Sequence, residues 1–235
     1  KQEGSVFVFE KKQFDRYSKD DREQMLEILK KSVIQLTKLR HPHVLTVQHP
    51  LEESRDSLAF ATEPCFASLA NVLGNVSLHV AQISAILMHS LQTFNLPQPN
   101  SLSSHKLHDV DTKYGLIQLC EGLSFLHADV KLLHRNICPE SIMINQGGAW
   151  KIFGFDYCIL NQNPHDAKAF WPFQEFNPTW QSLAQPSLEY MAPECGLING
   201  HSTYSFIVSL AAQIYTIFSP GGKPMKTFGK DYQGF

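Results

Sequence analysis

The chain has 235 residues, of which 43% are apolar, and its formal net charge is −2 with an isoelectric point near 6.6. This composition is typical of a globular protein with one large domain or two small lobes, and its near-neutral charge argues against nucleic acid or an anionic membrane as the main partner. Five scattered cysteines without C-x-x-C spacing favour reduced thiols and a cytoplasmic location over a disulfide framework.

The first elements expected along the chain are a strand and a long helix. Residues 5–10, S-V-F-V-F-E, are rich in the side chains that favour a pleated surface. Ser18 can cap a helix, and Asp20 and Asp21 suit the positive end of its dipole. Apolar residues then recur at helical spacing until His41-Pro42, where we expect the helix to end.

Three short elements are predicted next. Residues 44–48 and 57–62 indicate strands, and the polar residues 52–56 between them indicate a turn. Residues 68–73 favour a short helix that begins at a serine.

An atypical segment follows at residues 76–108. Its first part, residues 80–94, is apolar enough for a helix, whereas residues 95–104 are rich in Pro, Asn and Ser and indicate a loop. Such a stretch inside a compact domain is typical of an insertion.

The second half of the chain begins with a clear amphipathic helix at residues 111–129. Its apolar stripe is expected to comprise Leu116, Leu119, Cys120, Leu123 and Leu126. Two short strands are expected around Met143 and Ile152, an irregular aromatic-rich stretch at 161–188, and an apolar helix at 206–218. Strands and a helix followed by a mostly helical half predict an α+β architecture with two lobes.

The stretch from Leu133 to Tyr157, L-H-R-N-I-C-P-E-S-I-M-I-N-Q-G-G-A-W-K-I-F-G-F-D-Y, carries the most information. It resembles the protein-kinase pattern H-R-D-L-K-P-E-N … D-F-G. The retained positions are His134, Arg135, Pro139 and Glu140. The replaced positions are Asn136 for the catalytic Asp, Cys138 for the Lys, Ser141 for the metal-binding Asn, and Gly154 for the metal-binding Asp.

The first strand and the long helix lose their kinase charges as well. Aligned with V-A-I-K, Phe7 takes the Ala place and Phe9 the Lys place, and both rings are expected to point into the nucleotide cleft. If the alignment is shifted by two residues, the side chains still face the same side of the strand, and Lys11 becomes a substitute anchor for the phosphates. The partner Glu of the helix is expected nine residues before His41, and Ser32 occupies that position.

Within the kinase superfamily the chain is similar to the Scy-like pseudokinases of the coated-vesicle-associated type. Long runs carry this resemblance: L-T-K-L-R-H-P at 36–42, L-T-V-Q-H-P-L-E-E-S-R-D-S-L-A-F at 45–60, S-L-A-N-V-L-G-N at 68–75 and G-A-W-K-I at 148–152. The A-P-E motif at 192–194 belongs to the wider resemblance to protein kinases. The resemblance implies one incomplete, bilobal kinase-like domain over residues 1–235, with a small lobe at 1–66 and a large lobe at 67–235. It also implies that the first strands of the small lobe and the last helices of the large lobe are missing. Phe206 stands where kinases carry a buried Asp.

The replacements predict a catalytically inactive module, without catalytic residues, a metal site or an ATP–magnesium cofactor. Phosphoryl transfer depends on positioning and charge neutralisation, and Asn136 cannot accept the substrate proton as an Asp does. The resemblance implies a protein-interaction scaffold in clathrin-coated-vesicle traffic between the Golgi network and endosomes. Clathrin and adaptor complexes are the implied partners, and the chain would be peripheral to vesicle membranes through other proteins.

The alternative is a weak or unorthodox ATP-binding serine/threonine kinase. Lys11, Lys151 and Asp156 would then have to replace the missing charged groups. If ATP binds, its contacts are expected from Thr62, Glu63, Cys65, Lys11 and Met143.

Overall fold

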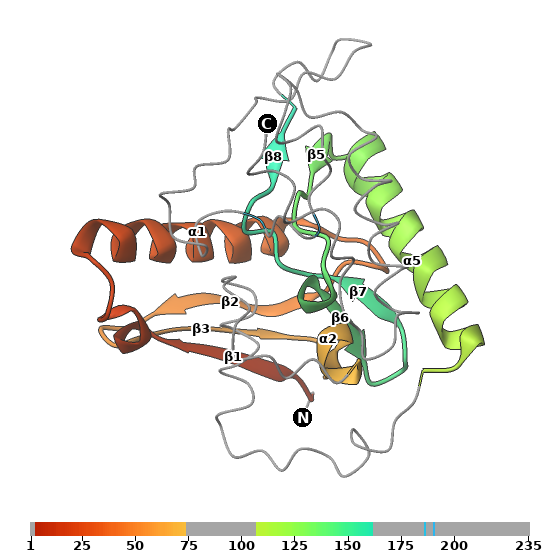
Figure 1. Cartoon of the computed structure of the whole chain (residues 1–235), viewed down its shortest axis with the longest axis horizontal. Helices are drawn as coiled ribbons and strands as arrows, with labels where there is room; N and C mark the ends of the chain where they lie inside the picture. Colours follow the sequence, from red (N-terminus) through yellow and green to blue (C-terminus); the bar gives the residue numbers. More distant parts are fainter. Residues whose placement is uncertain (1–2, 74–106, 162–185, 187–189, 191–235) are drawn as a thin grey trace, which may run out of the picture.

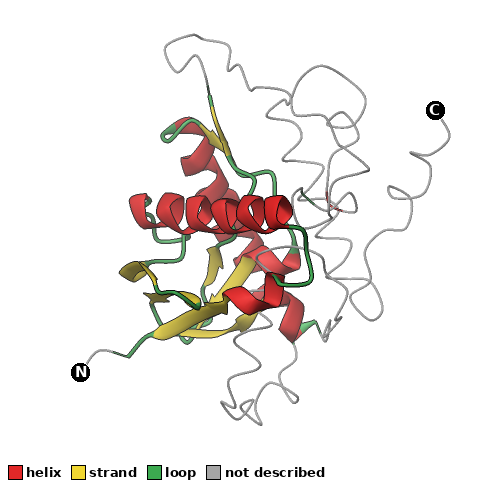
Figure 2. Ribbon diagram, turned by 90° about the vertical axis from the view of Figure 1, so that its left-hand side faces the viewer, coloured by secondary structure: helices red, strands yellow, loops and turns green. Residues whose placement is uncertain are grey.

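The computed structural model describes residues 3–73, 107–161, 186 and 190, and its strands form three small sheets (Figure 1). The first sheet has the order β1-β3-β2 and consists of β1 (Ser5–Glu10), β2 (Val47–Glu53) and β3 (Ser57–Thr62). Helix α1 (Lys19–Lys38) lies along one side of this sheet in both views (Figure 1, Figure 2). The expected α+β architecture is confirmed.

Strand β1 has the predicted bounds and alternates between the core and solvent. Phe7 and Phe9 are fully buried, whereas Val6, which precedes them, is 56% exposed and Val8 between them is half-buried. Phe7 pairs in register with Phe60 of β3, and the two rings stack with centroids 4.8 Å apart. The alternation therefore directs two aromatic side chains into the core from one short strand.

Helix α1 begins and ends close to the predicted positions. The hydroxyl of Ser18 accepts a hydrogen bond from the N–H of Asp21 at 3.1 Å, which caps the first turn. The apolar face is buried, and the helix ends at Leu39, whose backbone is extended, before His41-Pro42. The buried apolar side chains are those of Met25, Leu29, Val33 and Leu36.

Strand β2 begins three residues later than predicted and continues to Glu53, into the expected turn. The reason is a long-range pairing: Val44 forms a parallel bridge with Ile152, and the N–H of Leu45 donates to the carbonyl of Ile152 at 3.0 Å. Residues 44 and 45 therefore join the first half of the chain to the second half. The turn itself is limited to residues 54–56 and is closed by Ser54 N–H donating to Ser57 O at 2.9 Å.

The second sheet has the order β4-β6-β7, and its strands are β4 (Cys65–Ser68), β6 (Ile142–Asn145) and β7 (Trp150–Ile152). Strands β6 and β7 are the two predicted around Met143 and Ile152, whereas β4 was not expected. The predicted lobe boundary between residues 66 and 67 falls inside β4. Ser68 caps the short helix α2 (Leu69–Val72), as predicted.

A two-stranded sheet brackets the motif stretch. It pairs β5 (Leu132–Leu133) with β8 (Ile159–Leu160), and the 3-10 helix η2 (Pro139–Ser141) lies between β5 and β6. These two-residue strands have no periodicity that a sequence pattern could reveal, since only their pairing defines them.

Helix α5 (Asp109–Ala128) buries a different stripe from the one predicted. Leu119, Leu123 and Leu126 are buried as expected, but Leu116 is only half-buried and Cys120 is exposed. The remaining buried positions of the helix are Thr112, Gly115, Gln118 and Gly122. A Cβ at position 115 would meet the Trp150 ring, and one at position 122 would meet Ile152, so glycine lets β7 approach the helix closely.

Several expectations concern residues outside the described part of the chain. They are the segment at 76–108 up to residue 106, the irregular stretch at 162–188, the A-P-E motif and the helix at 206–218. Among the described residues, no helix is long and apolar enough to cross a membrane.

The close approach of α5 to β7 generates a first prediction, in which Gly115→Ala lowers the free energy of unfolding by about 1–2 kcal/mol. Alanine favours a helix by about 1 kcal/mol over glycine. Its methyl group, however, would overlap several atoms of the fully buried Trp150 ring, so the overpacking cost falls at the upper end of about 1–3 kcal/mol. Urea unfolding measures the change. Ser124→Ala at an exposed position of the same helix is the control, and equal stability of the Gly115→Ala variant and the unchanged protein would contradict the packing.

Candidate functional site

Asn136, which stands in the place of a catalytic acid, is buried and bonded within the protein. Its side-chain amide donates to the carboxylate of Asp156 at 3.3 Å and to the carbonyl of Gly154 at 3.4 Å. Its Oδ1 accepts from the Cys138 thiol at 3.7 Å. The amide thus joins the loop after β5 to the segment after β7, and a carboxylate at this position would face Asp156 as a like charge.

Cys138 and Ser141 also satisfy each other. The Ser141 hydroxyl donates to the carbonyl of Cys138 at 2.9 Å and accepts from its N–H at 3.0 Å. Burial raises the pKa of the Cys138 thiol well above its ordinary value, so the sulfur stays neutral and is no nucleophile at neutral pH. The Ser141 hydroxyl and the Cys138 backbone thus close the turn of η2.

His134 holds the aromatic residues of the motif in place. Its Nδ1 accepts from the N–H of Asn136 at 3.2 Å, so Nε2 carries the proton and donates to the carbonyl of Phe153 at 3.0 Å. The ring meets Phe155 edge-on with centroids 4.7 Å apart. Burial lowers the pKa of His134 to about 3, so the ring is neutral over the physiological range.

Gly154 offers no side-chain ligand to a magnesium ion. It has a positive φ of 74° and no side chain to coordinate a cation. Magnesium is usually held by carboxylates, and Oδ2 of the nearby Asp156 carboxylate accepts a hydrogen bond from the Asn136 amide. Within the described residues, no group of three or more His, Cys, Asp or Glu side chains is arranged to hold a metal ion.

Aromatic rings and a serine occupy the positions expected for the small-lobe ion pair. Phe7 contacts Phe153, the residue before Gly154, with ring centroids 5.4 Å apart, whereas Phe9 packs against Phe14 at 4.8 Å. Ser32 is buried in α1. Phe7 thus fills space next to the motif, and Phe9 belongs to a separate aromatic contact. The assignment of these residues to kinase positions rests on sequence likeness and stays a prediction.

Lys11, the alternative anchor, is bound at the end of the first sheet. It lies in the 3-10 helix η1 (Lys11–Phe14), and its ammonium group is 2.7 Å from Glu53 and 2.7 Å from the carbonyl of Ser54. Lys30 of α1 contacts the other oxygen of Glu53 at 2.7 Å. Hydrogen bonds from Lys11 and Lys30 lower the pKa of Glu53, so the carboxylate is ionised and holds both cations.

A partly buried polar cluster joins the two sheets where β3 leads into β4. We call Thr46, Glu63, Asn145 and Lys151 the hinge clamp. Glu63 Oε1 accepts from the N–H of Thr46 at 3.0 Å and lies 3.3 Å from the Lys151 ammonium, and Oε2 accepts from the Asn145 amide at 3.3 Å. Lys151 also donates to the carbonyl of Pro42 at 2.6 Å. Glu63, an expected ATP contact, and Lys151, an expected substitute charge, are therefore both engaged in contacts within the protein.

The expected nucleotide contacts are only partly brought together. Thr62 donates to the carbonyl of Glu63 at 2.9 Å and contacts the Cys65 sulfur at 3.7 Å. Met143 is buried on β6 opposite Ser68 of β4. Lys11 lies beyond the opposite end of the β3 strand, beside Asp56, whose carbonyl accepts its N–H.

Sequence analysis missed the roles of Thr46 and Asn145. A signal was available for Lys151, which stands between Trp150 and Ile152 in a three-residue strand that is buried throughout. A lysine in such a strand requires a partner. The partner could not be identified because Glu63 is far away in the sequence.

Comparison with known proteins places the chain in context. A family model described as "Protein tyrosine and serine/threonine kinase" matches residues 2–233. Human SCY1-like protein 2 is 49% identical over 239 residues, which cover 100% of this chain and 24% of that protein. Protein kinase-like protein SCY1 of Saccharomyces cerevisiae is 28% identical over 92% of this chain and 26% of its own length.

A third relative carries information on activity in its name. The "Probable inactive serine/threonine-protein kinase scy1" of Dictyostelium discoideum is 30% identical over 56% of this chain and 12% of its own length. The chain spans about a quarter of the length of the human and yeast relatives. The comparison therefore covers only that portion of each relative.

The hinge clamp generates a prediction on pH. Burial alone would raise the pKa of Glu63, but hydrogen bonds from Thr46 and Asn145 and the charge of Lys151 outweigh it and lower the pKa below the ordinary 4.5. The folded state therefore binds this proton less readily than the unfolded state, and the stabilisation is present above pH 4.5 and lost as pH falls through the folded pKa. Glu63→Gln should cost about 1–2 kcal/mol at pH 7 and progressively less below pH 4.5.

Urea unfolding of the Glu63→Gln variant and the unchanged protein between pH 7 and pH 3.5 measures this difference. Glu27→Gln, which removes one member of the exposed Lys31 pair on α1, is the matched control and should change stability by less than about 0.5 kcal/mol. A Glu63 difference that stays constant or grows on acidification would show that the carboxylate does not hold the hinge.

Proposed function

Because the chain belongs to the protein kinase family, which matches it over residues 2–233, we propose that it is a catalytically inactive kinase-like module that acts as a protein-interaction scaffold. The observation that carries this proposal is the Asn136 amide, bonded to Asp156 and Gly154 where the family has reacting carboxylates. The name of the Dictyostelium relative is in accord with it.

The missing groups are those on which phosphoryl transfer most depends. The reaction needs metal ions and cations to neutralise the phosphates, and a base to orient the attacking hydroxyl. Loss of a general base alone costs roughly 10²–10⁴ in rate, and the loss of charge stabilisation usually costs more. Asn136 offers no general base, and Gly154 has no side chain to hold a metal ion.

The contacts of the substitute residues argue against the alternative of a weak kinase. Lys11 is held by Glu53, Lys151 by Glu63 and the carbonyl of Pro42, and Asp156 by Asn136. Recruiting them to a nucleotide would first require breaking these contacts, two of which lie in buried surroundings where unpaired groups are costly.

The resemblance to coated-vesicle-associated Scy-like pseudokinases extends the proposal to a cellular role. Under it, the protein works in the cytoplasm on coated vesicles between the Golgi network and endosomes, with clathrin and adaptor complexes as partners. Much of the partner binding in that family lies beyond the kinase-like region. Co-purification of the protein with clathrin-coated vesicles tests this role, and its absence from them would refute it.

A nucleotide-binding experiment tests the proposed inactivity. Addition of millimolar ATP with magnesium should raise the melting temperature of the chain by less than about 2 °C, since a larger shift corresponds to roughly 1 kcal/mol of binding. No radiolabelled phosphate should be transferred to a generic protein substrate. ATP without magnesium provides the control for non-specific effects of the anion.

Lys11→Ala decides between the two hypotheses if transfer is observed. Phosphate transfer that disappears in this variant would replace the scaffold proposal with that of an unorthodox kinase. Transfer that persists unchanged in the variant would indicate a contaminating kinase, and the inactivity would stand.

A further inference from the structure

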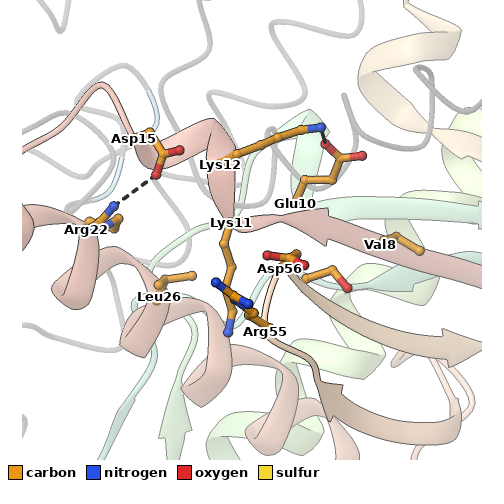
Figure 3. A pocket seen from close by; sticks show the side chains of 10 residues that line it. Val8, Glu10, Lys11, Lys12, Asp15, Arg22, Leu26, Arg55 and Asp56 are labelled. Atoms are coloured by element: carbon orange, nitrogen blue, oxygen red, sulfur yellow. Dashed lines mark hydrogen bonds and ion pairs between the residues drawn. The ribbon is translucent and has the colours of Figure 1, made fainter.

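A pocket of about 690 Å³ opens at the end of the first sheet, away from the kinase motif (Figure 3). The end of β1, η1, the first half of α1 and the β2–β3 turn line it. Its volume lies in the range of pockets that bind ligands. None of the replaced kinase positions contributes to it.

Most charges at this pocket are neutralised within the protein. Figure 3 shows the side chains of two of these ion pairs turned toward each other, each joined by a dashed line. The pairs are Lys12–Glu10 at 2.8 Å, Arg22–Asp15 at 3.0 Å, and Lys11 with Glu53 at 2.7 Å. These cations are thus held in place, and their charges are largely offset.

Arg55 is different from the other cations that line the pocket. It is exposed at the β2–β3 turn, and no side chain in the described part of the chain forms an ion pair or hydrogen bond with it. Its guanidinium group offers a planar set of donors that matches a carboxylate in two-point geometry. The adjacent Asp56 carboxylate is exposed and can accept a backbone N–H.

Two apolar side chains complete the lining. Val8 of β1 and Leu26 of α1 are both half-buried and border the same space as Arg55. An occupant that covers them would remove apolar surface from water. The pocket therefore presents a cation, an acceptor for N–H groups and an apolar contact at one place.

We propose that this pocket binds an acidic peptide segment of a partner protein. A carboxylate side chain pairs with Arg55, a backbone N–H donates to Asp56, and an apolar side chain packs on Val8 and Leu26. This inference rests on the proposed scaffold function and names the chemistry of one partner.

The charge balance favours a peptide over a phosphate group or a nucleic acid. A phosphate dianion is bound best by several free cations, and here the other three are already paired. Three acidic residues, Glu10, Asp15 and Asp56, also line the pocket and would repel a polyanion.

Fluorescence polarisation of the full chain tests the proposal. The probe is a fluorescein-labelled peptide with blocked ends and the sequence Gln-Leu-Asp-Gln-Leu-Gln, which carries a single carboxylate, and its neutral counterpart is Gln-Leu-Asn-Gln-Leu-Gln. The acidic probe should bind saturably and the neutral one at least about tenfold more weakly. Arg55→Glu should weaken the acidic probe by at least about tenfold, whereas Lys113→Glu, the same charge change at an exposed site on α5, should change it by less than about twofold.

Three results would overturn the proposal: no binding of the acidic probe up to 1 mM, equal binding of both peptides, or equal weakening by both substitutions. Melting temperatures of the variants verify that each is folded. The outcome is independent of the nucleotide test. If the chain fails to bind the peptide and does not respond to ATP, only this pocket is refuted. If it transfers phosphate and the transfer disappears in Lys11→Ala, the scaffold function is refuted whatever the peptide does.

Discussion

Buried polar groups of the motif stretch take most of their hydrogen bonds from inside the protein, and this matters because an unpaired buried polar group costs about 1–3 kcal/mol. The Asn136 amide bonds to Asp156 and Gly154, and the Ser141 hydroxyl bonds to Cys138. A site that must receive a charged nucleotide needs free donors and charges, and these residues use theirs for the fold.

The same constraint explains how the lobes are joined. Lys151 and Glu63 are largely withdrawn from water and satisfy each other, with Thr46, Asn145 and the carbonyl of Pro42 completing the cluster. Phe7 adds an aromatic contact from the first sheet to Phe153. A module with such internal contacts between its sheets is suited to present fixed surfaces, which is what a scaffold requires.

Local sequence signals predicted the elements whose ends depend only on neighbouring residues. Ser18 and His41-Pro42 bound α1 correctly because a cap and a proline act on their own neighbours. The start of β2 could not be predicted, since Val44 and Leu45 pair with Ile152 over a hundred residues away. The buried face of α5 was predicted only in part, and the reason is similar. Gly115 faces the Trp150 ring, and no helical periodicity encodes that contact.

The motif comparison predicts which positions have lost the kinase charges, but it could not supply the contacts that the residues at these positions make. Hydrogen–deuterium exchange with and without millimolar ATP and magnesium tests this account most directly. The account predicts unchanged exchange in peptides covering Leu133–Tyr157 and Ser5–Glu10. Slower exchange in these peptides on addition of the nucleotide would show that the cleft receives ATP and would contradict it.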